Sequence, residues 1–511
     1  MLTSENLNII VQRGIELTTE KDKNKLFDKL LASAMDIASC DAGTLYLYRN
    51  GALNFKIMKT FSQGVSKGEN GEEIDLPPVS LSEENICAYS AIHRELINIP
   101  DVYSSDRFDF SGPKRYDSIT GFKTRSMLVI PLEDSESELI GVLQLINKLD
   151  SDGNCIAFSD DDEFILKALG SMTAVALSNT IYLEELKEQM FSFVQAFATA
   201  VDERTPYNGS HTRHVTIYAN LLALYINKLH SEGKTEDYFD KDRMEQLILS
   251  AALHDIGKMV IPLSVMNKAT RLEEHMGEIE NRFELLGVLY ERDMLKGLIT
   301  ESELSGIKNY LTGSLEFIKA SNSAGFMTDD SIKRVEEIAS RSYKYEDRRV
   351  LKYLTDEERD YLLVRKGTLT PGERKIMESH VVMTGKILEK VHFNKKYGDV
   401  TKFASSHHEY LNGTGYPNRL KGDDLPLETR ILTVVDVFDA LTCTDRPYKK
   451  PIPRPQAFAI LHDMAKDGQL DNSIVTFLEE TLENISSEEI DRITAEDDWC
   501  KVHEYNKQEY T

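Results

Sequence analysis

Five histidines in the second half of the chain have neighbours that are suited to metal chemistry. His254 and Asp255 stand together at the end of an apolar helical stripe, and Lys258 follows one turn later. His407 and His408 are adjacent and lead into a glycine-rich turn. Burying His, Asp and Lys side chains is costly unless each one is paired or bound to a metal. For His254 and Asp255 alone, a structural hydrogen bond explains the pair equally well.

Further polar residues fall on predicted helix faces in the same half. Asp436 and Asp439 are spaced i to i+3 and therefore share one face of a helix. His380 lies on a helix that opens with a capping box and an early proline, and His211 starts another apolar stripe. Each histidine by itself is more commonly a hydrogen-bonded core residue. Together, five imidazoles and at least two carboxylates from five helical segments indicate a polynuclear metal site.

The elements that must position these residues are predicted to be helices. Helical periodicity dominates from about residue 197, which predicts an all-α catalytic domain over residues 201–475. Within it, residues 272–368 are charged and helical, with glycine or serine breaks near 306, 313 and 325, and we interpret them as a helical insertion. Residues 476–511 hold 11 acids and 3 bases, which predicts a solvated acidic helical end.

The first half of the chain is predicted to be an α+β sensor domain over residues 25–180, preceded by a lead-in helix at 1–24. Strands of an antiparallel sheet are expected between helices at residues 43–48, 52–58, 125–132 and 139–147. The last of these strands has apolar residues at both odd and even positions, which is typical of a central strand covered on both faces. The acidic turn from Ser159 to Asp162 favours the start of the next helix, because carboxylates complement the helix dipole.

Residues 181–200 are expected to continue that helix as a connector between the two halves. Its apolar residues recur at spacings of 3, 4, 3 and 4, which is a heptad seam made of Leu183, Leu186, Met190, Phe193 and Phe197. The seam favours a parallel dimer stalk, and the alternative is a connector that packs this stripe on its own domains. Two heptads are short for a coiled coil, so the flanking domains would have to support the homodimer.

Composition narrows the class of protein. A chain of 511 residues is too long for one ordinary core and predicts two or three domains. The net charge of −25 disfavours binding to nucleic acids and to anionic membranes. No stretch approaches 18 uninterrupted apolar residues, so no membrane span is expected. The odd number of cysteines, without a CxxC pair, favours reduced thiols and a cytoplasmic protein: Cys40, Cys87, Cys155, Cys443 and Cys500.

The second half resembles HD-GYP domains, which are bacterial cyclic di-GMP phosphodiesterases of the HD superfamily. The resemblance rests on HDIGK at 254–258, HHEYLNGTGYP at 407–417 and DVFDALT…DRPYK at 436–449. Two further strings, IPLSVMNKATRL at 261–272 and GTLTPGERKIMESHVVMTGKIL at 367–388, flank the predicted insertion. The likeness covers about residues 195–475.

The resemblance implies which residues bind two divalent ions. One ion would be held by His211, His254, Asp255 and Asp436, and the other by His380, His407 and His408, with Asp255 bridging the two. A histidine-rich, carboxylate-bridged site suits iron or manganese better than a structural zinc. A carboxylate near the first histidine would be needed for a third ion, and that position is in doubt because Tyr207 precedes His211, with Asp202 and Glu203 further away. His214 replaces the usual arginine and is expected to be a spectator.

The implied reaction is metal-dependent in-line hydrolysis of a cyclic dinucleotide. Lys258 would stabilise charge on the phosphoryl oxygens, and Asp439 would orient the nucleophile or relay its proton. Arg446 and Lys449 would grip a second phosphate or a guanine edge, and the loop with Gly415 and Tyr416 would shape the pocket. The expected products are linear pGpG and, if hydrolysis continues, GMP. A catalytically silent receptor or scaffold, or a phosphodiesterase for another dinucleotide such as cyclic GMP-AMP, are the alternatives.

The first half resembles a GAF domain of the cyclic-nucleotide-phosphodiesterase type. The likeness rests on DVYSSDRFDFSGPKRYDSITGFKTRSMLVIP at 101–131, on IGVLQLINK at 140–148, and on the spacing of Lys148, Phe158 and Asp162. In such domains the lysine and the aspartate are expected to pair and brace the fold. The resemblance implies a regulatory role in signal transduction, and it leaves open whether the domain binds a cyclic nucleotide or another small ligand, senses redox state or only dimerises.

Overall fold

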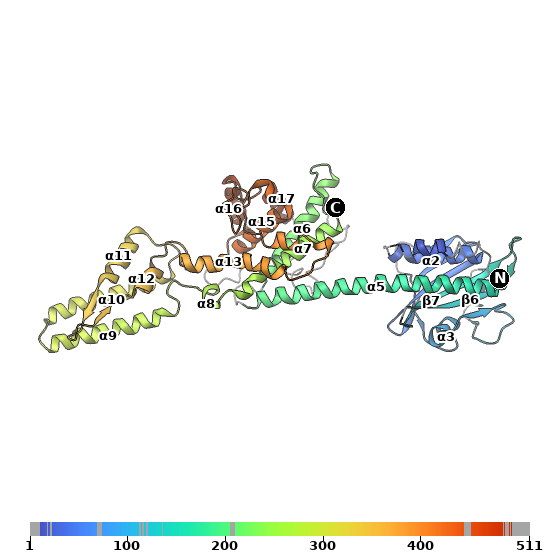
Figure 1. Ribbon diagram of the computed structural model, residues 1–511, viewed down its shortest axis with the longest axis horizontal. Coiled ribbons are helices and arrows are strands. Elements are labelled where there is room, and N and C mark those ends of the chain that lie inside the picture. Colours follow the sequence, from blue (N-terminus) through green and yellow to red (C-terminus); the bar gives the residue numbers. More distant parts are fainter. Residues whose placement is uncertain are drawn as a thin grey trace. The chain divides into compact units, whose positions relative to one another are not determined.

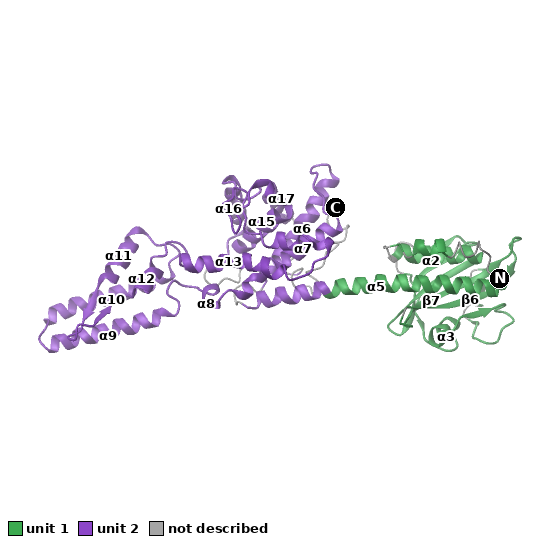
Figure 2. Cartoon of the chain, in the orientation of Figure 1, with its two compact units in different colours: residues 1–189 green, residues 190–511 purple. Residues whose placement is uncertain are grey.

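The computed structural model describes residues 11–17, 19–20, 23–68, 74–111, 114, 117–118, 121–134, 136–204, 210–443, 451–483, 485, 490 and 492. The chain separates into two compact units, residues 1–189 and 190–511 (Figure 2). The boundary falls inside the expected connector, and the other predicted domain limits remain predictions.

The first unit is built around an antiparallel sheet in the order β3-β2-β1-β7-β6-β5, with β4 beside β2 and β8 beside β7 (Figure 1). Its strands are β1 Cys40–Arg49, β2 Ala52–Thr60, β3 Val65–Lys67, β4 Val79–Ser80, β5 Ile97–Ile99, β6 Met127–Glu133, β7 Leu139–Leu149 and β8 Cys155–Ile156. The four strands expected from the sequence are present, and β7 lies centrally with both faces buried, as its apolar pattern predicts. The strands that the sequence did not predict have only two or three residues, too few to show a period of two.

Helices cover both faces of this sheet. Helix α2, Lys23–Ala38, and the first part of α5, Asp160–Asp202, pack on one face, and α3, Ile86–His93, packs on the other. The Lys148 ammonium forms an ion pair with Asp162, whose carboxylate also accepts hydrogen bonds from the amide and hydroxyl of Ser159, both at 2.7 Å. This pair braces the end of β7 against the start of α5, as the resemblance implies.

The second unit contains a helical domain with one large core, apart from the predicted insertion. Its helices are α6 His211–Ser231, α7 Lys241–Leu253, η1 Ile256–Val260, α8 Leu263–Met266, α13 Pro371–Leu388, η2 Lys395–Tyr397, α14 Val400–Ala404, η3 Gly422–Asp424, α15 Leu427–Thr442, α16 Arg454–Lys466 and α17 Asn472–Glu483. The expected solvated end at 476–511 is wrong for residues 476–483, because Leu478 and Leu482 of α17 are buried in this core. An acidic average conceals the apolar face of such an amphipathic helix.

The predicted insertion forms a subdomain with its own core. It contains α9 His275–Leu295, α10 Glu301–Ser323, α11 Asp329–Ser340, α12 Asp356–Leu362 and a two-stranded hairpin of β9 Ser342–Lys344 and β10 Val350–Lys352. The second half is helical as expected, and this short hairpin in the insertion is the addition that the sequence did not predict. The expected breaks at Gly306 and Gly313 are wrong, because α10 runs through both glycines. A helix tolerates isolated glycines at about 1 kcal/mol each.

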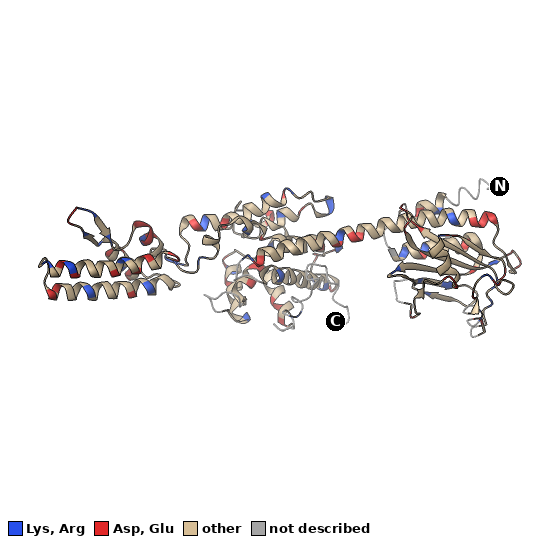
Figure 3. Cartoon of the chain, turned by 90° about the horizontal axis from the view of Figure 1, so that it is seen from below, with Lys and Arg blue, Asp and Glu red and all other residues tan. Residues whose placement is uncertain are grey.

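Charged residues in the insertion pair across its helices. Figure 3 shows acidic and basic residues interspersed along α9 and α10. Two ion pairs join these helices. Lys308 pairs with Glu291, and the Lys319 ammonium lies 2.6 Å from the Glu280 carboxylate. The charges are therefore part of a solvated helix surface.

Among the described residues, α5 is the one helix long and apolar enough to cross a membrane by length and composition. Part of its apolar surface packs within the protein, because Leu166, Leu169 and Leu177 are buried in the core of the first unit. Phe191 and Val194, further along, are buried in the core of the second unit. One helix thus contributes side chains to both cores.

Candidate metal centre

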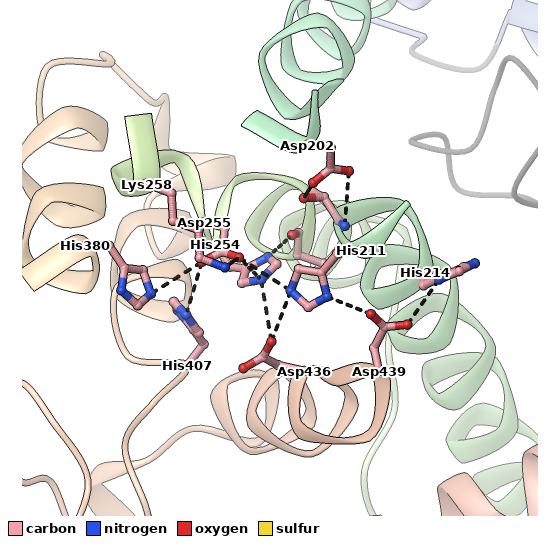
Figure 4. Close-up of polar contacts among 12 residues, drawn as sticks. Asp202, His211, His214, His254, Asp255, Lys258, His380, His407, Asp436 and Asp439 are labelled. Carbon is pink, nitrogen blue, oxygen red and sulfur yellow. Dashed lines mark hydrogen bonds and ion pairs between the residues drawn. The ribbon is translucent and has the colours of Figure 1, made fainter. Parts of the chain in front are cut away.

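The HD pair lies where α7 gives way to the tight turn of η1. His254 follows the last residue of α7, and its Nδ1 lies 2.6 Å from the carbonyl oxygen of Ala251. A carbonyl can only accept a hydrogen bond, so Nδ1 carries the proton and Nε2 presents its lone pair. That Nε2 faces Asp255 Oδ2 at 3.3 Å. The end of α7 therefore aims an imidazole and a carboxylate at the same point (Figure 4).

Two more histidines are oriented in the same way from other helices. His380 Nδ1 on α13 donates to the Met377 carbonyl at 2.7 Å, and His407 Nδ1 after α14 donates to the Ala404 carbonyl at 2.7 Å. Within the described chain, the buried Nε2 atoms of His254, His380 and His407 have no hydrogen-bond partner. Three buried lone pairs without donors are costly, and metal coordination would satisfy them.

Burial also favours the neutral form of three imidazoles of the cluster, those of His380, His407 and His408. It lowers the pKa of His380 to about 4, although the charge of Asp255 acts in the opposite direction. Burial likewise lowers the pKa of His407 well below its ordinary value and lowers that of His408. A neutral imidazole is the form that binds a metal, so no proton has to be displaced at these three residues.

Asp255 lies at the middle of the cluster. Its Oδ2 faces His211 Nε2 at 3.4 Å and His254 Nε2 at 3.3 Å, and its Oδ1 faces His380 Nε2 at 3.3 Å and His407 Nε2 at 3.9 Å. Burial by itself would raise the pKa of Asp255, but the charges of Lys258 and His254 outweigh it and hold the pKa well below the usual range. The result is an ionised carboxylate with one oxygen toward each pair of histidines.

His211 is held between the two aspartates of α15. Asp436 Oδ1 lies 3.2 Å from its Nε2, and Asp439 Oδ2 lies 2.7 Å from its Nδ1. Burial alone would lower the pKa of His211, but hydrogen bonds with Asp255, Asp436 and Asp439 raise it well above its ordinary value. The i to i+3 spacing on α15 thus places one carboxylate at each ring nitrogen.

Asp439 therefore lies behind His211, on the side away from Asp255. Its other oxygen, Oδ1, lies 3.1 Å from His214 Nδ1. A proposed role that fits this place is to fix the tautomer of His211, so that Nε2 faces the cluster. His214 contacts Asp439 and is not among the groups of side chains whose ligand atoms converge.

The ligand atoms gather into three overlapping groups. Within each group the atoms lie within 4.8 Å of one another: His211, His254 and Asp436; His254, Asp255 and His407; and His380, His407 and His408. These nitrogen and oxygen donors, three of them with unpartnered lone pairs, fit the coordination of divalent metals. All seven expected metal ligands are close neighbours in the fold. Two of them, His211 and Asp436, are 225 residues apart in the sequence.

The remaining predicted residues surround this cluster unequally. The half-buried Lys258 ammonium donates to Asp255 Oδ2. The Tyr416 ring lies 4.9 Å from the His408 ring, centroid to centroid, and burial raises the pKa of the Tyr416 hydroxyl. Gly415 is buried, and a Cβ there would lie 2.4 Å from the Tyr410 amide nitrogen. Arg446, Lys449 and Tyr207 lie outside the described residues.

Sequence reasoning missed two residues that support the site. Glu409 is buried, and its carboxylate accepts hydrogen bonds from the amides of Asn418 at 2.6 Å and Leu420 at 3.0 Å, which fixes the loop around Tyr416. Thr384 Oγ1 accepts from the Gly257 amide at 3.0 Å and donates to the His254 carbonyl at 2.9 Å. An acid next to two histidines was a signal for Glu409, whereas a threonine inside a helix gave no signal for Thr384.

Comparison with known proteins matches both halves of the chain. A family model described as HD domain matches residues 360–474, and one described as GAF domain matches residues 20–178. A 3'3'-cGAMP-specific phosphodiesterase 3 from Vibrio cholerae is 37% identical over 102 residues, which cover 20% of this chain and 21% of that protein. A probable cyclic di-GMP phosphodiesterase from Vibrio cholerae is 40% identical over 109 residues, covering 20% of this chain and 24% of that protein.

The likeness to these relatives is confined to a part of each chain. This chain spans about a fifth to a quarter of the length of the two Vibrio cholerae proteins. Among solved structures, the GAF domain of an Acinetobacter phosphoenolpyruvate-protein phosphotransferase is 16% identical and aligns with 36% of this chain and 99% of its own, with a TM-score of 0.28. The HD match contains His380, His407, His408 and Asp436. The chain combines a GAF domain over residues 20–178 with an HD domain over residues 360–474.

Proposed function

We propose that this chain is a metal-dependent phosphodiesterase that hydrolyses cyclic di-GMP to pGpG and, if hydrolysis continues, to GMP. The observation that carries the proposal is the convergence of five imidazoles on the two oxygens of Asp255 and on Asp436. Similar proteins include phosphodiesterases of cyclic di-GMP and of cGAMP, which makes a cyclic dinucleotide the substrate class of choice.

One divalent ion would be held by His211, His254, Asp255 and Asp436, and a second by His380, His407 and His408. Nitrogen and carboxylate donors of this kind suit iron or manganese. When bound, such ions supply an activated water and neutralise charge on the phosphate. Asp439 keeps the proton of His211 on Nδ1, and Lys258 offers a cation next to Asp255 for the developing phosphoryl charge. Tyr416, held in its loop by Glu409, would line the substrate pocket with Gly415.

The proposal is tested by turnover with a panel of nucleotides. The full chain is purified without oxygen and loaded with Fe²⁺ or Mn²⁺, and cyclic di-GMP, 3'3'-cGAMP, cyclic AMP and cyclic GMP are supplied separately. We expect hydrolysis of cyclic di-GMP to pGpG, and loss of that activity after metal removal with a chelator. Faster hydrolysis of 3'3'-cGAMP than of cyclic di-GMP would identify 3'3'-cGAMP as the preferred substrate, which is also a cyclic dinucleotide. Binding of a dinucleotide without hydrolysis under any metal would instead establish a receptor.

We propose that the GAF domain regulates this activity by binding a small ligand. Burial raises the pKa of the Cys40 and Cys87 thiols to about 12, and the thiolate is the reactive form, so these two cysteines are disfavoured as redox sensors. The proposed setting is a soluble cytoplasmic protein, in line with the acidic composition and with the use of α5 in two domain cores.

We also propose a parallel homodimer through α5. Leu183, Leu186, Phe193 and Phe197 of the heptad seam are 55–67% exposed, and Met190 between them packs partly against the second core. Leaving four large apolar side chains in water along one stripe is unfavourable, and a second copy of the same stripe would bury them.

Charged residues on the seam are expected to separate the homodimer. With Leu186→Glu and Phe193→Glu together, sedimentation velocity should report a monomer, because like charges would face each other across the seam. Ser192→Glu adds one glutamate at an exposed position next to the seam and should leave the dimer intact. A dimer that survives the double substitution would refute the stalk.

A further inference from the structure

The last turn of α5 makes contacts that the proposed reaction does not use directly. Asp202, the last residue of α5, is buried, and its carboxylate accepts a hydrogen bond from Thr212 Oγ1 at 2.6 Å and from the Thr212 amide at 3.2 Å (Figure 4). Thr212 lies in the first turn of α6, directly after His211. Ser210 at the start of α6 makes no capping hydrogen bond with its side chain. Asp202 therefore supplies the capping acceptor for α6 from another helix.

A second contact reaches the other side of the cluster. Arg204, two residues after Asp202, donates from Nη2 to the carbonyl oxygen of Ile261 at 2.9 Å. Ile261 directly follows η1, the short helix that starts directly after Asp255 and contains Lys258. The guanidinium thus holds the end of η1, while the carboxylate of Asp202 holds the start of α6.

These two elements face each other across the cluster. His211 of α6 and Asp255 before η1 approach to 3.4 Å between Nε2 and Oδ2. At the end of α5, Asp202 is hydrogen-bonded to the residue that follows His211. Arg204 is hydrogen-bonded to the residue that follows η1, the helix directly after Asp255. Val194 and Ala198 anchor the same turns of α5 in the helical core. A shift of the end of α5 would therefore change the separation of His211 and Asp255.

We propose that Asp202 and Arg204 are positioning residues of the metal centre, which make the end of α5 part of the support for His211 and Asp255. The proposal rests on the metal-dependent function proposed above. It gives that function a route for regulation, because α5 begins in the core of the GAF domain with Leu166 and Leu169. A GAF-domain change that moves α5 would alter the affinity for the metal at His211 and Asp255.

The test measures metal binding without substrate. Mn²⁺ is titrated into the metal-free full chain and followed by electron paramagnetic resonance, which reports both the affinity and the ligand environment. Asp202→Asn leaves one acceptor oxygen for two donors, and Arg204→Met removes the donor to Ile261 while keeping an apolar stem. We expect each substitution to weaken Mn²⁺ binding about tenfold, as is typical when a support of a metal ligand is lost, and to alter the spectrum.

Matched variants separate positioning from charge and from folding. Glu203→Gln removes a carboxylate at the exposed position between the two residues and should bind Mn²⁺ as the wild type does. Arg204→Lys keeps a donor and should recover part of the affinity lost in Arg204→Met. If Asp202→Asn does not fold, Thr212→Val removes the same side-chain hydrogen bond from the other partner.

The outcomes distinguish this proposal from the proposed reaction. Wild-type affinity and spectrum in Asp202→Asn, Thr212→Val and Arg204→Met would overturn the positioning role, whatever the turnover. An equal loss in Glu203→Gln would also overturn it, because the effect would then be one of net charge. A wild type that binds Mn²⁺ but hydrolyses no dinucleotide, with the expected loss in the variants, would refute the reaction and leave the positioning role standing.

Discussion

Replacing Asp255 by alanine is expected to abolish hydrolysis. Its two oxygens face four histidine nitrogens at 3.3–3.9 Å, so the substitution removes a carboxylate that contacts histidines of both halves of the cluster. The ammonium of Lys258 would also lose its partner next to several buried imidazoles. We expect a fall in turnover larger than the ~100-fold that follows loss of a supporting residue around a metal, because a proposed direct ligand is lost.

Turnover and metal content per chain check this prediction together. Both should fall, since an imidazole offers no negative charge to bridge two cations. Asp423→Ala, which removes an exposed carboxylate from η3 in the same domain, serves as the control and should retain both properties. Full activity of Asp255→Ala would remove the basis of the enzymatic proposal.

Gly257→Ala should have the second-largest effect, through the backbone. A Cβ at Gly257 would lie 1.9 Å from the His380 carbonyl oxygen and 2.5 Å from the Thr384 amide nitrogen. Neither backbone atom can rotate away, so η1 and α13 would have to move apart by about 1 Å, a displacement that can lower catalysis roughly 100-fold. Because α13 carries His380 and η1 follows Asp255, the 3.3 Å approach between these two residues would be lost.

The same substitution should also destabilise the domain. Crowding a packed interior costs about 1–3 kcal/mol, and a backbone collision should fall at the upper end of that range or beyond it. The hydrogen bonds that join Thr384 to Gly257 and His254 would be strained as well. Chemical denaturation gives the free energy of unfolding, and metal analysis of the folded fraction gives the effect on the cluster.

Gly372→Ala is a matched control for this prediction. Gly372 lies in the first turn of α13, and a Cβ there would meet nothing within 4 Å. Alanine in a helix should leave stability unchanged or raise it by about 0.5–1 kcal/mol, and activity should not change. A Gly257→Ala variant that behaves like this control would show that the close packing of η1 on α13 is not needed by the site.

The sequence determined the identity of the polar residues and the elements that carry them. Strands with a strong apolar pattern, such as β7, and the start of α5 at its acidic turn follow from local rules, because period and capping depend only on near neighbours. The motifs also indicated that His254, Asp255, His407, His408 and Asp436 belong to one site. These residues are strong signals because buried charges and imidazoles need partners.

Only the tertiary structure decided how those residues face one another. The spacing of Asp436 and Asp439 predicts a shared helix face, but it cannot say that they take opposite nitrogens of His211, a contact spanning 228 residues for Asp439. The hydrogen bonds between Thr384 and Gly257 and between Asp202 and Thr212 likewise join different helices. The burial of α17 also depends on a partner surface. Each of these depends on long-range packing, which places side chains from distant segments within hydrogen-bond distance and has no signature in the local order of residues.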